Sequence, residues 1–311
     1  MDNVLIDTRF SYFDAIRWTV EIFLTNGKVP FFIPERKGGG PACLTKQQVS
    51  QFKMLGGFND DWDCCYGLLV YILSLQISAR TIGELRKKID IPAFAKTISQ
   101  YPLQVSGIVK HLGRPAGVTI EKIARIFQEV YLGPDIFAKI EKTRAAYWKK
   151  KGLMYKEKLI FRKSTLDKVK AMGIRMGIAT GRPRFEAIYA LDRFGILELF
   201  DSIVTTNEVK KAEKEMRQSL RKPHPYSLLQ AANKLKTHQG VLYIGDLPDD
   251  ILTVNRAKKN LGVQSVAFPS HSDDPKKILE EMGKVDPDYL LMKAGDLPKL
   301  LKYPNPYRFK Q

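Results

Sequence analysis

Short apolar runs that predict strands alternate with helical segments in the second half of the chain, and this alternation constrains the fold more than any other feature. The runs occupy residues 174–179, 202–205, 241–244, 263–268 and 289–291. Strands separated by helices form parallel sheets, since each helix carries the chain back to the start of the next strand. The sequence therefore predicts an α/β fold with a Rossmann-like, doubly wound parallel sheet, whose ligands lie at the carboxyl ends of its strands.

Residues 9–162 are predicted to be almost entirely helical. In the first helix, expected over residues 9–25, apolar side chains recur at steps of three and four residues, at Phe10, Phe13, Ile16, Val20 and Phe23. We therefore expect two domains: a core formed by residues 1–8 and 163–311, and an all-helical domain of residues 9–162 inserted into it.

The composition is that of a globular protein of 311 residues, with 44% hydrophobic and 27% charged residues. No apolar run approaches the roughly 20 residues of a membrane-spanning helix, and the first residues lack the pattern of a signal peptide. The three cysteines, two of them adjacent, do not indicate a disulfide framework. These features predict a cytoplasmic protein without a membrane partner.

The formal net charge of +18 is compatible with nucleic acid, an acidic membrane surface or phosphorylated substrates as partners. The basic residues are dispersed, however, and runs such as Lys149-Lys150-Lys151 are short. We therefore expect a small phosphorylated substrate, and the pattern does not favour nucleic acid. No feature of the sequence indicates an oligomeric state.

An acidic cluster follows the predicted strand at residues 241–244. Gly245 permits a tight turn there, and Asp246 emerges at the carboxyl end of the strand. Carboxylates at such a position are suited to Mg²⁺, which prefers oxygen ligands. Alternatively, the acidic residues Asp249 and Asp250 stabilise the positive end of the following helix.

A small hydroxyl ends the predicted strand at residues 174–179. Thr180, with the backbone N–H groups of Gly181 and Arg182, could hold a phosphoryl oxygen or a substrate anion. Alternatively, Thr180 is a helix N-cap ahead of Pro183.

Lys222 lies in a stiff loop, in the sequence Lys222-Pro223-His224-Pro225. A cation fixed by prolines could neutralise negative charge on a phosphoryl group during its transfer. The alternative is an ordinary solvated lysine.

These motifs resemble, in their order, the haloacid dehalogenase superfamily of phosphohydrolases. The chain opens Met1-Asp2-Asn3-Val4-Leu5-Ile6-Asp7-Thr8, which is similar to the end of the family's Asp-x-Asp-Gly-Thr-Leu motif. A helical insert, the strand ending at Thr180, the Lys-Pro pair and the Gly-Asp-x-x-x-Asp segment follow in family order. The helical insert is typical of the subfamily that includes phosphoglycolate phosphatase and β-phosphoglucomutase.

The resemblance implies a Mg²⁺-dependent phosphatase that works through an aspartyl-phosphate intermediate. It assigns Asp2 as the general acid and base, with its backbone carbonyl on the metal. Thr180 would bind the phosphoryl group, and Lys222 would bridge it to the nucleophile. Asp246 would bind Mg²⁺, and Asp250 would either bind the metal as well or orient Lys222.

The nucleophile of the family lies two positions ahead of Asp2, outside the given sequence. The strand that carries it is central in the family's sheet, and each buried backbone group left unpaired costs about 1–3 kcal/mol. We therefore expect the natural chain to begin earlier, with an Asp just before Met1. The alternatives are a catalytically inactive phosphate-binding or regulatory protein and a phosphomutase.

The helical insert contains the segment Gly56-Gly57-Phe58-Asn59-Asp60-Asp61-Trp62-Asp63. Loops of this kind read the substrate in helical-cap enzymes, so Asn59 and Trp62 are candidate substrate-binding residues. Alternatively, the acidic residues simply cap the next helix.

Overall fold

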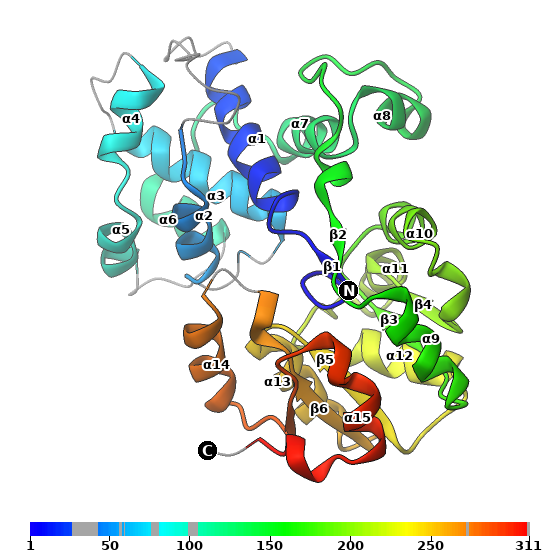
Figure 1. The fold of residues 1–311 in the computed structure, drawn as a ribbon. Coiled ribbons are helices and arrows are strands. Elements are labelled where there is room, and N and C mark those ends of the chain that lie inside the picture. The colour runs from blue at the N-terminus through cyan, green and yellow to red at the C-terminus, as the bar shows by residue number, and fades with distance from the viewer. Residues whose placement is uncertain are drawn as a thin grey trace. The chain divides into compact units, whose positions relative to one another are not determined.

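The computed structural model describes residues 1–26, 43–55, 58, 60–75, 81–98, 105–271 and 274–309. The chain forms two compact units: unit 1 is Met1–Asp7 with Lys158–Gln311, and unit 2 is Thr8–Glu157 (Figure 1). The second boundary lies at Lys158 rather than at residue 163, because β2 (Lys158–Leu159) pairs antiparallel with β1 (Ile6–Asp7) and Phe161 is buried in the core of unit 1.

Unit 2 is helical throughout its described part. Its helices are α1 (Tyr12–Asn26), α2 (Lys46–Lys53), α3 (Asp61–Ser74), α4 (Ile82–Lys88), α5 (Ile91–Ile98), α6 (Val105–Leu112), α7 (Ile120–Leu132) and α8 (Pro134–Glu141). Helix α3 packs against α1, α6 and α7. Every residue from Cys64 to Ile72 is buried, as expected of a helix that is apolar on all sides.

The first helix begins later than the periodicity predicts. Helix α1 starts at Tyr12, and Phe10 precedes it with 47% of its surface exposed. The prediction that Phe10 belongs to the apolar face was therefore wrong, whereas Ile16, Val20 and Phe23 are buried as expected. Phe10 instead has the ammonium of Lys46 4.0 Å from its ring centroid, which accounts for a ring at the surface.

Unit 1 contains the predicted parallel strands. Strand β3 (Gly177–Ala179) pairs with β4 (Ser202–Val204), and β5 (Val241–Gly245), β6 (Val263–Ala267) and β7 (Tyr289–Leu290) form a second ladder. The connecting helices are α9 (Lys163–Ala171), α10 (Arg184–Arg193), α11 (Thr206–Met216), α12 (Tyr226–Lys234), α13 (Pro248–Ala257), α14 (Pro275–Gly283) and α15 (Leu297–Lys302). Among the described strands, β3 is hydrogen-bonded only to β4 and β5 only to β6.

Helices cover both faces of the β5 ladder. Alternate residues of a strand point to opposite faces, and Leu242 and Ile244 pack on the main core, which includes residues of α9 and α15. Val241 and Tyr243 pack on a second cluster formed with α12 and α13. This arrangement confirms the predicted doubly wound α/β class.

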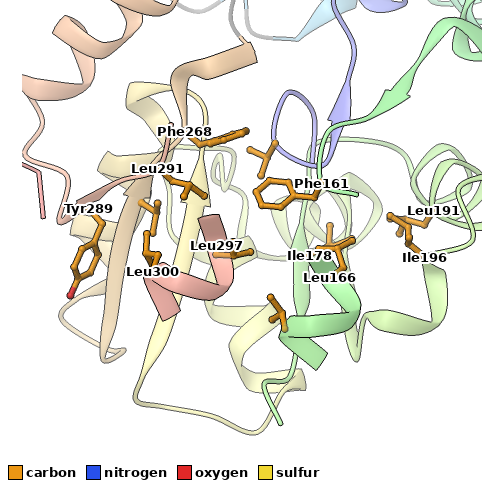
Figure 2. Close-up of a cluster of buried hydrophobic side chains, with 13 residues drawn as sticks. Phe161, Leu166, Ile178, Leu191, Ile196, Phe268, Tyr289, Leu291, Leu297 and Leu300 are labelled. Carbon is orange, nitrogen blue, oxygen red and sulfur yellow. The ribbon is translucent and has the colours of Figure 1, made fainter. Parts of the chain in front are cut away.

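The main core joins the two ladders of unit 1. Ile178 of β3 and Val266 of β6 are buried in one cluster with Phe161 and Phe268, whose ring centroids lie 5.4 Å apart (Figure 2). Full burial of such a side chain contributes about 1.5–3 kcal/mol. The core thus holds the strand ends of both ladders in one body.

None of the helices that the structure describes is long and apolar enough to cross a lipid bilayer.

Candidate active site

Asp250 is the most fully hydrogen-bonded carboxylate at the end of β5. Its Oδ1 accepts hydrogen bonds from Lys222 Nζ at 2.7 Å and from the Tyr243 hydroxyl at 3.3 Å. Its Oδ2 accepts the backbone N–H groups of Asp246 and Leu247, each at 3.2 Å. Both carboxylate oxygens therefore have protein donors, which favours the orienting role for Asp250 over the role of metal ligand.

Gly245 permits this close packing of Asp250. A Cβ atom on Gly245 would lie 2.2 Å from Cβ of Asp250 and 2.6 Å from its Cγ. The first turn of α13 thus folds back directly onto the end of β5. The glycine is required by the position of Asp250, beyond any need for a tight turn.

Lys222 and Asp250 form a charged pair. Burial lowers the pKa of Lys222, but the Asp250 carboxylate and Tyr243 raise it by more, so it lies well above its usual value. Burial raises the pKa of Asp250, but Lys222, the Met1 amino group and the hydrogen bond from the Leu247 N–H together lower it by more. Both groups therefore carry their charges at neutral pH, and Lys222 is not the ordinary solvated lysine of the alternative interpretation.

Asp246 is the carboxylate best suited to a cation. Burial and the negative charge of Asp250 raise the pKa of Asp246 to about 7, and the chain's amino terminus and Lys222 only partly offset this. A divalent cation would relieve such uncompensated negative charge. No cluster of three or more His, Cys, Asp or Glu side chains placed to hold a metal occurs within the described residues. Mg²⁺, however, commonly binds one or two carboxylates together with water and substrate phosphate.

Thr180 lies at the carboxyl end of β3 and is 4% exposed. Its N–H donates to the carbonyl of Val204 at 2.9 Å, and its Oγ1 accepts the N–H of Arg182 at 3.2 Å. The N-cap of α10 is Pro183, so Thr180 does not cap that helix. Gly181 is exposed, and a Cβ atom there would meet no other atom within 4 Å.

Arg182 contacts a predicted catalytic residue. Its side chain is only 1% exposed, and its Nε donates to Asp2 Oδ1 at 2.5 Å. Its carbonyl accepts the N–H of Thr206 at 3.1 Å, so its backbone is fixed to the start of α11. The side chain of Arg182 thus binds Asp2, and the assignment of Arg182 as a substrate-binding residue stays a prediction.

The first residues of the chain lie among these charged groups. Asn3 has a φ of 48°, a conformation that asparagine adopts more readily than most residues. The amino group of Met1 is buried, which lowers its pKa, and it interacts electrostatically with Asp2, Lys222, Asp246 and Asp250. The backbone nitrogen of Met1 therefore lies within electrostatic reach of Asp2, Lys222, Asp246 and Asp250.

The predicted substrate loop belongs to unit 2. Asn59 lies outside the described residues. Trp62 is in the first turn of α3, and its N–H donates to the N-cap carboxylate of Asp60 at 3.0 Å. Asp61 pairs with Lys53 at 2.5 Å, and Phe58 is fully buried against Phe52. Capping and packing therefore account for Phe58, Asp60 and Asp61.

Two features of the site were missed by sequence reasoning. One is Tyr243, which shares Asp250 with Lys222; its signal is a polar hydroxyl within an apolar strand, two residues before Gly245. The other is the Asp2–Arg182 pair, for which the sequence gives no local signal because 180 positions separate its members.

Residues 87–268 match the family of haloacid dehalogenase-like hydrolases. The chain belongs to this family. The sequence is also similar to the pyrophosphatase PpaX of Halalkalibacterium halodurans, with 29% identity over 136 residues. The aligned region covers 43% of this chain and 54% of the relative. PpaX of Oceanobacillus iheyensis is 28% identical over 134 residues, 43% of this chain and 55% of the relative. The chain thus spans about half the length of these relatives.

Solved structures show the same fold. The X-ray structure of a structural genomics target matches with a TM-score of 0.67 and 19% identity, covering 97% of both chains. A predicted phosphoglycolate phosphatase of Haemophilus somnus matches with a TM-score of 0.52 and 15% identity, covering 96% of this chain and 94% of the other. The family and fold class expected from the order of the motifs are confirmed.

Proposed function

We propose that this protein is a Mg²⁺-dependent phosphatase of a small phosphorylated metabolite, acting through an aspartyl-phosphate. The observation that carries the proposal is the ion pair between the half-buried Lys222 and the buried Asp250, beside Asp246 at the carboxyl end of β5. Ligands of doubly wound sheets bind at this edge. A fixed cation next to a carboxylate of raised pKa is suited to bind a metal and a phosphoryl group together.

The nucleophile in this proposal is an Asp two positions ahead of Asp2. The similarity of residues 1–8 to the end of the family's first motif supports this position. The electrostatic interactions of the Met1 nitrogen with Lys222, Asp246 and Asp250 support it as well, since a residue attached to that nitrogen would lie near the same groups.

In the first step, a carboxylate oxygen of this Asp attacks the phosphorus and the bond from phosphorus to the leaving oxygen breaks. Asp2 gives a proton to that oxygen, and Lys222 neutralises charge on the phosphoryl group. In the second step, Asp2 takes a proton from water, whose oxygen attacks the phosphorus. The bond between phosphorus and the Asp carboxylate then breaks and releases inorganic phosphate.

Asp246 is the residue of the described chain that would hold Mg²⁺, together with the backbone carbonyl of Asp2. When bound, the ion would neutralise negative charge on the nucleophile and the phosphoryl oxygens. Asp250 would keep Lys222 in place, and the Thr180 hydroxyl and the Gly181 N–H would bind phosphoryl oxygens. The contact with Asp2 supports a positioning role for Arg182.

The substrate is a small phosphorylated metabolite in this proposal, with pyrophosphate and phosphoglycolate as candidates because relatives and neighbours are named for them. Asn59 and Trp62 of unit 2 remain proposed substrate contacts. If Trp62 contacts the substrate, Trp62→Ala should raise KM in steady-state kinetics. A thermal melt should show that the variant still folds.

The test is release of inorganic phosphate by the protein isolated from its source organism, whose N-terminus is first established by intact mass. Candidate phosphate esters and pyrophosphate are offered with Mg²⁺ and again with EDTA. We expect hydrolysis only with Mg²⁺. The Lys222→Met enzyme, expressed with the same N-terminus, should lose about 10²–10³-fold in kcat, whereas Lys276→Met, an exposed lysine, should not.

Each alternative has its own signature in this assay. An inactive phosphate-binding protein would release no phosphate from any substrate. A phosphomutase would convert a sugar phosphate to its isomer with little free phosphate. Phosphate release that EDTA leaves unchanged would contradict the proposal directly.

A further inference from the structure

We propose that Tyr243 is a positioning residue that holds the Lys222 ammonium in place for phosphoryl transfer. The inference rests on the proposed function, because it concerns the cation of that reaction. It adds a residue to the site that no motif of the sequence marks.

Tyr243 contacts both members of the Lys222–Asp250 pair. Its hydroxyl donates to Asp250 Oδ1 at 3.3 Å, and the same oxygen accepts Lys222 Nζ at 2.7 Å. The centroid of its ring lies 5.5 Å from Lys222 Nζ. The ammonium is therefore bounded by a carboxylate oxygen and by an aromatic ring, which attracts cations.

The ring of Tyr243 is itself held by the core. It packs against a cluster formed by Ala179, Val204 and Ala231, and against a second cluster that includes Leu228 and Val254. Ala179 is the residue before Thr180, so Tyr243 packs directly against the end of β3. Tyr243 therefore contacts both the Lys222–Asp250 pair and the strand that ends at Thr180.

The carboxylate alone does not fix Lys222. Asp250 is anchored through Oδ2 by two backbone N–H groups, so its position does not depend on Tyr243. Lysine, by contrast, ends in a flexible four-carbon chain whose ammonium can rotate about a single acceptor. The Tyr243 ring restricts that freedom, because it bounds the ammonium on a side that Asp250 does not cover.

The first test is a graded series of variants. Tyr243→Leu removes ring and hydroxyl, and we expect kcat to fall about tenfold, less than removal of a direct donor costs, with a smaller change in KM. Tyr243→Phe restores the ring, and kcat should return to within about threefold of the original value. Tyr289→Leu is the matched control: Tyr289 is a buried strand tyrosine whose hydroxyl donates to Gln264, and the described part of the structure shows no contact between it and Lys222, Tyr243 or Asp250. It should lower the melting temperature without lowering kcat.

The second readout does not depend on activity. Acetylation of Lys222 by acetic anhydride, measured by peptide mass spectrometry, reports how firmly the ammonium is held. We expect faster acetylation of Lys222 in Tyr243→Leu than in the original protein, with Tyr243→Phe close to the original and Tyr289→Leu unchanged.

The two readouts separate this inference from the proposed function. If the original protein hydrolyses neither a phosphate ester nor pyrophosphate, the proposed function fails, and the role of Tyr243 in the reaction fails with it even where acetylation responds. If the protein is active but Tyr243→Leu leaves kcat or Lys222 acetylation within the range of Tyr289→Leu, the positioning role of Tyr243 alone is overturned.

Discussion

Gly245 and Asp250 pack so closely that a side chain on Gly245 would displace Asp250. A Cβ atom on Gly245 would overlap the Asp250 side chain, and Asp250 in turn holds Lys222. The constraint comes from packing and does not depend on any catalytic role of the glycine.

We expect Gly245→Ala to displace Asp250 and to lower the free energy of unfolding by about 1–3 kcal/mol, as overpacking does in well-packed cores. Urea unfolding would measure it. Gly295→Ala is the control, because a Cβ there meets nothing within 4 Å. Its unfolding free energy should change by less than about 0.5 kcal/mol. Equal stability of the two variants would contradict the contact between Gly245 and Asp250.

At the scale of single residues, the sequence predicts which side chains belong to the site better than it predicts which side chains they contact. Lys222, Asp246 and Asp250 each follow a local signal, namely a proline-fixed loop or the end of an apolar strand. Arg182 and Asp2 meet only because the fold brings distant segments together, and no spacing in the sequence encodes that pair. The choice between metal ligand and orienting residue for Asp250 likewise depends on which donors reach its two oxygens.

Among the elements, β6 and β7 are linked by more than their ladder. Asp288, just before β7, accepts the N–H of Ser265 at 2.8 Å and its hydroxyl at 3.0 Å, and Lys258 lies 3.0 Å away. Burial raises the pKa of Asp288, but these donors lower it by more. Asp288 is therefore a carboxylate whose folded-state pKa is depressed.

A depressed pKa means that Asp288 stabilises the fold above its unfolded pKa of about 4, and that this contribution is lost as the pH falls through the lower folded value. At pH 7 we expect Asp288→Asn to lower the free energy of unfolding by about 1–2 kcal/mol. The difference between the two proteins should shrink below about pH 4. Chemical unfolding at several pH values would measure it.

The control for this prediction is Asp286→Asn, an exposed residue with a φ of 54° that asparagine also adopts. Its unfolding free energy should stay within about 0.5 kcal/mol of the original at every pH. A pH-independent loss in Asp288→Asn would contradict the role of the charge.

The positions of the parallel strands could be predicted from the sequence, because each strand is a short apolar run between turn residues. The predicted runs at 241–244 and 263–268 differ from β5 and β6 by one residue at one end. The pairing of strands is a property of distant segments, so the sequence did not indicate that β3–β4 and β5–β6–β7 form separate ladders. The antiparallel pairing of β1 with β2 was unexpected for the same reason.

At the scale of the whole molecule, unit 2 (Thr8–Glu157) is inserted into unit 1, and side-chain hydrogen bonds hold its first and last residues close together. Glu157, its last residue, accepts hydrogen bonds from the hydroxyls of Ser11 and Tyr131, each at 2.9 Å. All three side chains are buried. An inserted unit with adjacent ends interrupts its host little, so one core can form from residues on either side of it. That the two units act as catalytic core and substrate-reading cap is part of the proposed function.

The central claim is covalent catalysis by an aspartate ahead of Asp2, and trapping of the intermediate tests it most directly. The protein from its source organism is quenched during turnover with Mg²⁺ and substrate and reduced with borohydride, which converts an aspartyl-phosphate to homoserine. Peptide mass spectrometry then locates the change. We predict homoserine two positions ahead of Asp2. Phosphate release without any homoserine, or homoserine at another residue, would contradict the account.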